Sequence, residues 1–206
     1  MPWRAGERVV APEATVEKLA GGFAFTEGPT CDRDGNVLFT DQPSDRILKW
    51  STEGRLSTFL QPAGRANGMY FAPGGDLIAC ADEKTALWSI APDGRTTVLL
   101  DTYGRSVLNG ANDVWVRSDG ALYFTDPFYP PPWWTYDAMP QDGQHVYFLS
   151  ADRRRLVGVI TDLTMPNGII GTPDGRSLFV SDIEANQTCT SLYGVRMRVR
   201  GANAAK

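Results

Sequence analysis

At 206 residues the chain has the length of one domain with room for a hydrophobic core. Its net charge of −4 argues against a nucleic-acid partner, which usually selects a basic surface, and no apolar stretch approaches the roughly 20 residues that span a bilayer. No signal-peptide pattern is visible at the start. We therefore expect a soluble protein, one domain over residues 1–206. Its compartment stays open between the cytoplasm and, for a trimmed N-terminus, the periplasm or the exterior.

A repeated unit organises the chain. Each unit begins with a polar head residue, continues through a turn dipeptide such as Asp-Gly or Gly-Gly, and ends with an apolar strand that closes on an acid. The four heads are Glu27, Asn67, Asn112 and Asn167, and the four closing acids are Asp41, Asp82, Asp126 and Asp182. Repeats of about 40–50 residues with several short strands each are typical of a β-propeller. Because every unit has the acid, we interpret the acids as structural supports and expect the varying heads to form the functional site.

In chain order, each unit predicts one blade of short strands. The strands expected in the first two units cover residues 28–31, 37–41, 46–50, 55–60, 69–71, 77–81, 85–90 and 96–100. The third unit carries an insertion at 127–144 that is rich in proline and aromatic residues. In the fourth unit, strands at 169–171 and 178–181 precede an irregular tail from about residue 191. The fold class is therefore all-β, with about four blades that form either a ring or part of a larger propeller. An open end would expose apolar surface and favour self-association.

Four segments carry a more specific signal: 26–29 (TEGP), 108–114 (LNGANDV), 123–127 (YFTDP) and 165–169 (MPNGI). In this order and at this spacing they resemble the blade motifs of the senescence marker protein/gluconolactonase/luciferin-regenerating enzyme family, in its bacterial gluconolactonase-like branch. The resemblance implies a six-bladed propeller that holds one divalent cation, often calcium, in its central channel and hydrolyses lactones or related esters. It also implies that Glu27, Asn112 and Asn167 are metal ligands.

The resemblance leaves the catalytic base unassigned. The family has an Asp in a Pro-Asp-Gly-like motif at the head of its fifth blade, which serves as a metal ligand and is usually cast as the general base. This sequence ends before any such fifth-blade motif. We therefore expect the chain to be a C-terminally truncated version of a longer protein. Whether the truncated form is active stays open.

The residue types at the heads favour an oxygen-ligated cation independently of the family. In a propeller the heads of the innermost strands line the channel, so they should converge. One carboxylate with several amide oxygens suits Ca²⁺ or Mg²⁺ better than zinc or copper. We expect Ca²⁺, with Mg²⁺, Mn²⁺ and Zn²⁺ as alternatives. The candidate substrate contacts are Asn67, Asn112 and, in the insertion, Trp133 and Trp134.

These residues lead to a hypothesis of function with two alternatives. A bound cation can polarise a carbonyl and lower the pKa of bound water, so the leading hypothesis is a metal-dependent sugar lactonase of the gluconolactonase kind. A non-catalytic propeller scaffold with a structural calcium ion is the first alternative. An organophosphate ester hydrolase is the second, because a lactone carbonyl and a phosphoryl centre both seek an oxygen-ligated cation.

Overall fold

Each repeat unit folds into one sheet of antiparallel strands that follow one another in chain order. The computed structural model describes residues 15–183 and 189–196. The first two blades consist of β1 (Thr26–Cys31), β2 (Val37–Asp41), β3 (Arg46–Trp50), β4 (Leu56–Leu60), β5 (Ala66–Phe71), β6 (Leu77–Ala81), β7 (Ala86–Ile90) and β8 (Thr96–Leu100). The third and fourth consist of β11 (Val114–Val116), β12 (Leu122–Asp126), β13 (His145–Leu149), β14 (Leu156–Ile160), β15 (Pro166–Gly171), β16 (Ser177–Ile183) and β17 (Cys189–Arg196). The prediction of an all-β fold built from four blades is confirmed.

Three small elements connect the strands. A short hairpin of β9 (Thr102–Tyr103) and β10 (Ser106–Val107) joins the second blade to the third. Two 3₁₀ turns, η1 (Gln42–Ser44) and η2 (Asp82–Lys84), follow β2 and β6. Across the described ranges, 15–183 and 189–196, none of the helices has the length and apolar character needed to cross a membrane.

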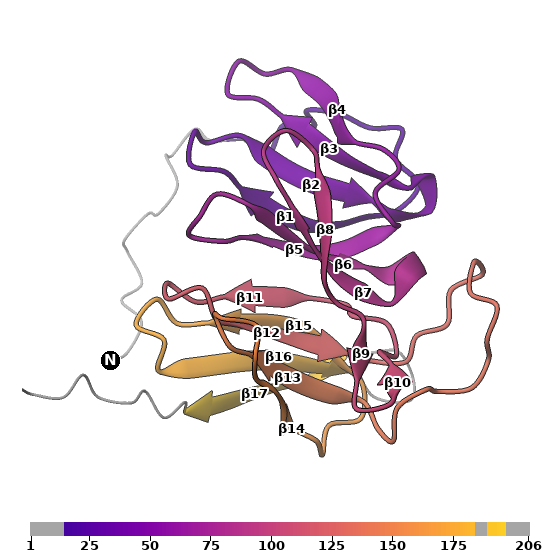
Figure 1. Cartoon of the computed structure of the whole chain (residues 1–206). Helices are drawn as coiled ribbons and strands as arrows, with labels where there is room; N and C mark the ends of the chain where they lie inside the picture. The colour runs from indigo at the N-terminus through magenta and orange to yellow at the C-terminus, as the bar shows by residue number, and fades with distance from the viewer. Residues whose placement is uncertain (1–14, 184–188, 197–206) are drawn as a thin grey trace, which may run out of the picture.

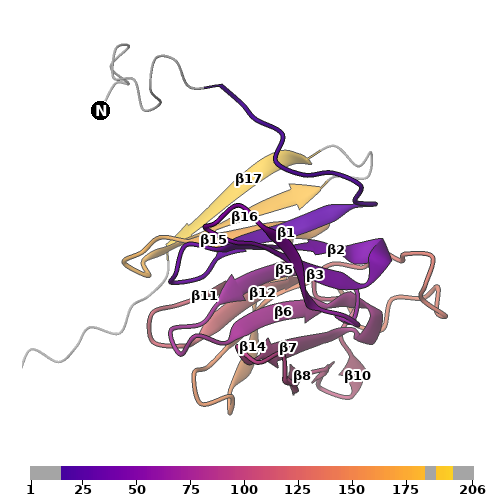
Figure 2. The same ribbon diagram turned by 90° about the horizontal axis from the view of Figure 1, so that it is seen from above.

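The blades pack side by side around a common centre. In Figure 1 the first two blades form the upper half and the other two the lower half, with the innermost strands β1, β5, β11 and β15 between them. Contacts join β1 to β5, β5 to β11, and β11 to β15. Figure 2 shows the fourth blade from above, with β15 on its inner side and β17 on its outer side. This order brings the start of each innermost strand to the centre.

Apolar side chains fill the spaces between neighbouring blades. All five residues of β6 and all five of β12 are buried, because the second and third blades are covered on both faces. Ile78 of the second blade packs in one cluster with Phe124 and Tyr147 of the third. Ile47 of the first blade packs with Leu77 of the second. Burial of these side chains supplies the main driving force that holds the blades together.

The interface between the first two blades can be tested with Ile47→Val. Ile47 is 0% exposed in that interface, so loss of one methyl group is expected to lower the free energy of unfolding by about 1 kcal/mol. Urea denaturation followed by tryptophan fluorescence measures this change. Ile170→Val makes the same deletion at a side chain that is 55% exposed and is expected to change the free energy by less than about 0.5 kcal/mol. Equal losses in the two variants would contradict the packing described.

The expectation of an irregular tail from about residue 191 is wrong for the described residues up to 196. Residues Cys189–Arg196 form β17, which pairs antiparallel with β16 from Ser177↔Arg196 to Asp182↔Ser191. A third strand of a blade needs neither the turn dipeptide nor the closing acid, because the neighbouring strand supplies its backbone partners. The remainder of the expected tail, residues 197–206, lies outside the described residues.

The innermost strands begin earlier than the sequence predicts. β1, β5 and β15 each start two or three residues before the expected position. In all three, the register with the next strand shifts around the head residue. Such a β-bulge bends the strand and re-aims its side chains, and bulges are common next to functional sites. The alternation of apolar residues breaks at a bulge, which explains why the sequence places the strand start too late.

Apolar side chains are exposed on the first and fourth blades. Val37 lies on the first blade, and Ile170 and Phe179 lie on the fourth. Self-association through these blades stays a prediction, which light scattering over a concentration series would test.

Candidate metal and substrate site

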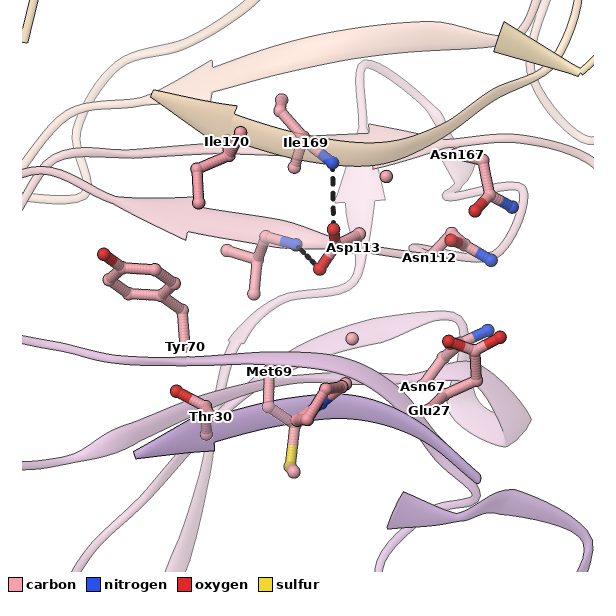
Figure 3. Close-up of a pocket in the computed structure, with 15 residues that line it drawn as sticks. Glu27, Thr30, Asn67, Met69, Tyr70, Asn112, Asp113, Asn167, Ile169 and Ile170 are labelled. Atoms are coloured by element: carbon pink, nitrogen blue, oxygen red, sulfur yellow. Dashed lines mark hydrogen bonds between the residues drawn. The ribbon is translucent and has the colours of Figure 1, made fainter. Parts of the chain in front are cut away.

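The structure brings the four head residues together at the centre of the molecule. In Figure 3, Asn112 and Asn167 lie on one side and Glu27 and Asn67 on the other, with their side chains at the same end of the pocket. All four line a central cavity of about 240 Å³ and also a second cavity of about 470 Å³ next to the insertion 127–144. The heads therefore stand at the boundary between the two cavities.

Small residues allow the innermost strands to approach one another at this point. In the first, second and fourth units the head is followed by glycine. A Cβ on Gly68 would lie 2.6 Å from the Cα of Asp113 and 2.7 Å from the carbonyl oxygen of Asn112. The Gly68 N–H donates to that same carbonyl oxygen at 2.7 Å. Only glycine leaves enough space for this contact between the second and third blades.

Asp113 occupies the position that is glycine in the other three units. Its carboxylate lies beside Gly68 and Gly168, and it accepts the N–H of Ile169 and the N–H of Val114, both at 2.9 Å (Figure 3). Burial raises the pKa of Asp113 to about 6, although the two backbone hydrogen bonds oppose the shift. The bond to Ile169 links the third blade to the fourth. Asp113 was not among the predicted site residues, although the replacement of the repeat's glycine by Asp is a sequence signal that distinguishes it.

Glu27 provides the one carboxylate among the heads. Burial raises the pKa of its carboxyl group, with a smaller opposing effect from the Gly28 N–H. A cation bound beside it would offset that penalty on the charged form. The two hydrogen bonds marked in Figure 3 both run to the Asp113 side chain, and neither joins the side chains of two heads.

The donor set at the centre fits a hard divalent cation. In the part of the chain that the structure describes, no group of three or more His, Cys, Asp or Glu side chains could hold a metal ion. The heads instead offer one carboxylate and three amide side chains, and oxygen donors of this kind are those that Ca²⁺ and Mg²⁺ prefer. Glu27, Asn112 and Asn167 could therefore hold a cation, with Asn67 beside them.

The insertion 127–144 forms one wall of the larger cavity. Its residues Tyr129, Trp133 and the three prolines between them line that cavity together with the heads. The guanidinium of Arg65 lies 4.7 Å from the centre of the Trp133 ring. Trp134, the other tryptophan considered for substrate contact, is not among the residues that line this cavity. It stacks on Tyr136 with ring centres 4.9 Å apart. Of the two tryptophans, Trp133 is the one placed to contact a ligand.

Asp82 is a second residue at the site that was not among the predicted site residues. It closes the second unit, and its carboxylate accepts the Trp133 indole N–H at 3.0 Å. Burial raises the pKa of Asp82 to about 7, with the Trp133 hydrogen bond and the charge of Arg65 acting in the opposite direction. Asp82 lines the same cavity as the four heads. In the sequence, Asp82 has the same residue type and repeat position as the other three closing acids, so no local signal distinguishes it from them.

These features define a β-propeller whose four head residues, one glutamate and three asparagines, line the cavities at its centre. The chain belongs to the SMP-30/gluconolactonase/LRE-like family, because residues 25–197 match the family model for that region. The resemblance drawn from the sequence motifs is confirmed. The chain is 31% identical over 183 residues to a gluconolactonase of Zymomonas mobilis, a match that covers 81% of this chain and 51% of the relative. It therefore spans about half the length of that curated relative.

Two solved structures show the same fold at higher coverage. A gluconolactonase from Xanthomonas campestris superposes with a TM-score of 0.81 at 26% identity, over 88% of this chain and 61% of that one. A structural-genomics structure with a provisional gluconolactonase assignment gives a TM-score of 0.82 at 32% identity, over 93% of this chain and 66% of that one.

Proposed function

We propose that the protein is a divalent-metal-dependent lactonase that opens the ring of a sugar lactone. The observation that carries the proposal is the convergence of Glu27 and three asparagine side chains on a cavity of about 470 Å³, a volume in the range of about 300–1,000 Å³ typical of small-molecule sites. Membership of the family and the gluconolactonase relatives support the reaction class and are consistent with a divalent cation. The lactone and the metal, with Ca²⁺ preferred, are part of the proposal.

The reaction adds one water molecule across the ring ester. The water oxygen bonds to the carbonyl carbon, the ring C–O bond breaks, and the ring oxygen takes a proton, so the product is a hydroxy acid. A divalent cation, when bound, supplies charge stabilisation for the carbonyl oxygen as it becomes negative and makes water more acidic. Glu27, Asn112 and Asn167 would hold that cation.

The chain's own residues orient the substrate. The amide of Asn67 lines both cavities and can donate an N–H to a lactone oxygen. The side-chain NH₂ group of Asn112 can do the same. The wall that contains Trp133 limits access of solvent to the lactone. Asp113 accepts two backbone N–H groups, which suits a residue that positions the adjacent Asn112. No residue is assigned as the general base.

Ring opening of glucono-δ-lactone, followed as acid release at constant pH, tests the proposal. We expect saturable turnover above the spontaneous rate, lost on treatment with a chelator and restored by Ca²⁺. No turnover under any of Ca²⁺, Mg²⁺, Mn²⁺ or Zn²⁺, in a folded chain, would overturn it. The same metal series with a phosphotriester distinguishes the organophosphate hydrolase, and cation binding without turnover of either substrate would support the non-catalytic scaffold.

A further inference from the structure

The four closing acids are alike in sequence, but three of them share a structural role. Asp41, Asp126 and Asp182 each accept two backbone N–H groups from the segment that leads into the innermost strand of the same blade, at 2.7–3.2 Å. Their carboxylates are therefore committed to holding the blade together.

In the second blade a different residue has this role. The Oδ1 atom of Asp45 accepts the N–H of Ala63 at 2.9 Å and the N–H of Arg65 at 2.7 Å, and these residues lead into β5. Asp45 thus replaces Asp82 as the support of the innermost strand. The carboxylate of Asp82 is left available for another contact.

The carboxylate of Asp82 is held at the wall of the larger cavity. Its Oδ2 atom accepts the Trp133 indole N–H at 3.0 Å and the Gln42 side-chain amide at 3.4 Å. Its Oδ1 atom accepts no hydrogen bond from the residues that the structure describes. A Cβ on Gly110 would lie 3.3 Å from this oxygen but 2.4 Å from the Trp134 ring, so the missing side chain at Gly110 makes room for that ring. The cavity that the head residues share is also lined by Asp82, Trp133, Gln42 and Gly110. One carboxylate oxygen is therefore held by Trp133 and Gln42, and the other has no hydrogen bond from the described residues.

This arrangement matches the chemistry that distinguishes a sugar lactone from a plain one. Both have the ring ester, but only the sugar lactone has several hydroxyl groups, each of which can donate a hydrogen bond. A buried carboxylate is a strong acceptor, and it is costly to leave without a partner once a ligand displaces water. A site built to bond a substrate hydroxyl therefore discriminates strongly against an analogue that lacks it.

We propose that Asp82, positioned by Trp133 and Gln42, forms a hydroxyl-binding subsite that selects polyhydroxylated lactones over unsubstituted ones. The inference rests on the proposed function, since it places the ring ester at the head residues and the hydroxyl groups at Asp82. The two ends lie in one continuous cavity, which lets a single ligand reach both.

Binding of two stable lactams tests the subsite without relying on turnover. Glucono-δ-lactam and δ-valerolactam have the ring shape of the corresponding lactones, but only the first has hydroxyl groups. Calorimetric titration of the whole chain, with Ca²⁺ present, is expected to show at least about tenfold tighter binding of glucono-δ-lactam. Asp82→Asn is expected to reduce that preference by about tenfold, to nearly equal binding of the two lactams, the effect of weakening a hydrogen bond to the substrate hydroxyl, while leaving δ-valerolactam binding unchanged.

A second variant and a matched control complete the test. Trp133→Phe keeps a smaller aromatic ring but removes the N–H that fixes the carboxylate, and a smaller loss of preference is expected. Asp76→Asn changes the same charge in the same blade, where Asp76 accepts the Ser89 hydroxyl at 2.8 Å, and is expected to leave the preference unchanged. Equal binding of both lactams by the wild type, no binding of either, or an equal loss of both in Asp82→Asn would overturn the subsite. Lactone turnover with an unchanged lactam preference in Asp82→Asn would overturn the subsite alone and leave the proposed function standing.

Discussion

Glu27→Gln is expected to lower the rate of lactone hydrolysis at limiting Ca²⁺ by at least about 100-fold, equivalent to about 2.7 kcal/mol. Glu27 is the one carboxylate among the four heads that line both cavities, so its replacement by a neutral amide of the same shape removes the negative charge that attracts the cation. Initial rates measured over a series of Ca²⁺ concentrations separate weaker cation binding, which excess Ca²⁺ corrects, from a lower maximal rate.

Glu53→Gln is the matched control for this change. The Glu53 side chain is 64% exposed in the turn between β3 and β4, remote from the lining of both cavities, and its neutralisation is expected to leave the hydrolysis rate unchanged. A Glu27→Gln variant with the wild-type rate and the wild-type Ca²⁺ dependence would show that the cation, if one is needed, binds elsewhere.

Gly68→Ala is expected to destabilise the fold by about 3 kcal/mol, the upper part of the usual range for overpacking. The new Cβ would lie 2.6 Å from the Cα of Asp113 and 2.7 Å from the carbonyl oxygen of Asn112. Both are backbone atoms, so no side-chain rotation relieves the clash. The two innermost strands would have to separate, which breaks the hydrogen bond from Gly68 to Asn112. Urea denaturation followed by circular dichroism measures the change.

Gly74→Ala provides the comparison for Gly68→Ala. A Cβ on Gly74 would have no atom within 4 Å, and the backbone there does not adopt a positive φ. Its free energy of unfolding is expected to stay the same or to rise by up to about 1 kcal/mol, because alanine restricts the unfolded chain. If the two variants had the same stability, the close approach of β5 and β11 at the centre would be wrong.

The blades were predictable because their signals are local. An Asp-Gly or Gly-Gly turn followed by a short apolar strand marks the hairpin between the first two strands of each blade, and the structure has β2, β6, β12 and β16 at those places. β17 had no such signal, since its position depends on backbone pairing with β16. The bulges in β1, β5 and β15 likewise interrupt the alternation on which the expected strand starts depended.

The candidate site was predictable only in part, for a related reason. The heads differ from unit to unit at one fixed position, so comparison of the repeats finds them. Asp82 has the same position and type as three structural acids, and its different role depends on Asp45 and on Trp133, which lies 51 residues away in the sequence. Contacts between distant segments decide such roles. Asp113, in contrast, breaks the glycine of the repeat and could have been found by the same comparison.

Calorimetric titration of Ca²⁺ into the metal-free chain tests the central claim most directly. The geometry of the heads predicts saturable binding of one ion per chain that is strongly weakened in Glu27→Gln and unchanged in Glu53→Gln. Absence of saturable binding of Ca²⁺, Mg²⁺, Mn²⁺ or Zn²⁺ by a chain whose circular dichroism shows a folded all-β protein would contradict the claim that Glu27 and the three asparagines form a cation site.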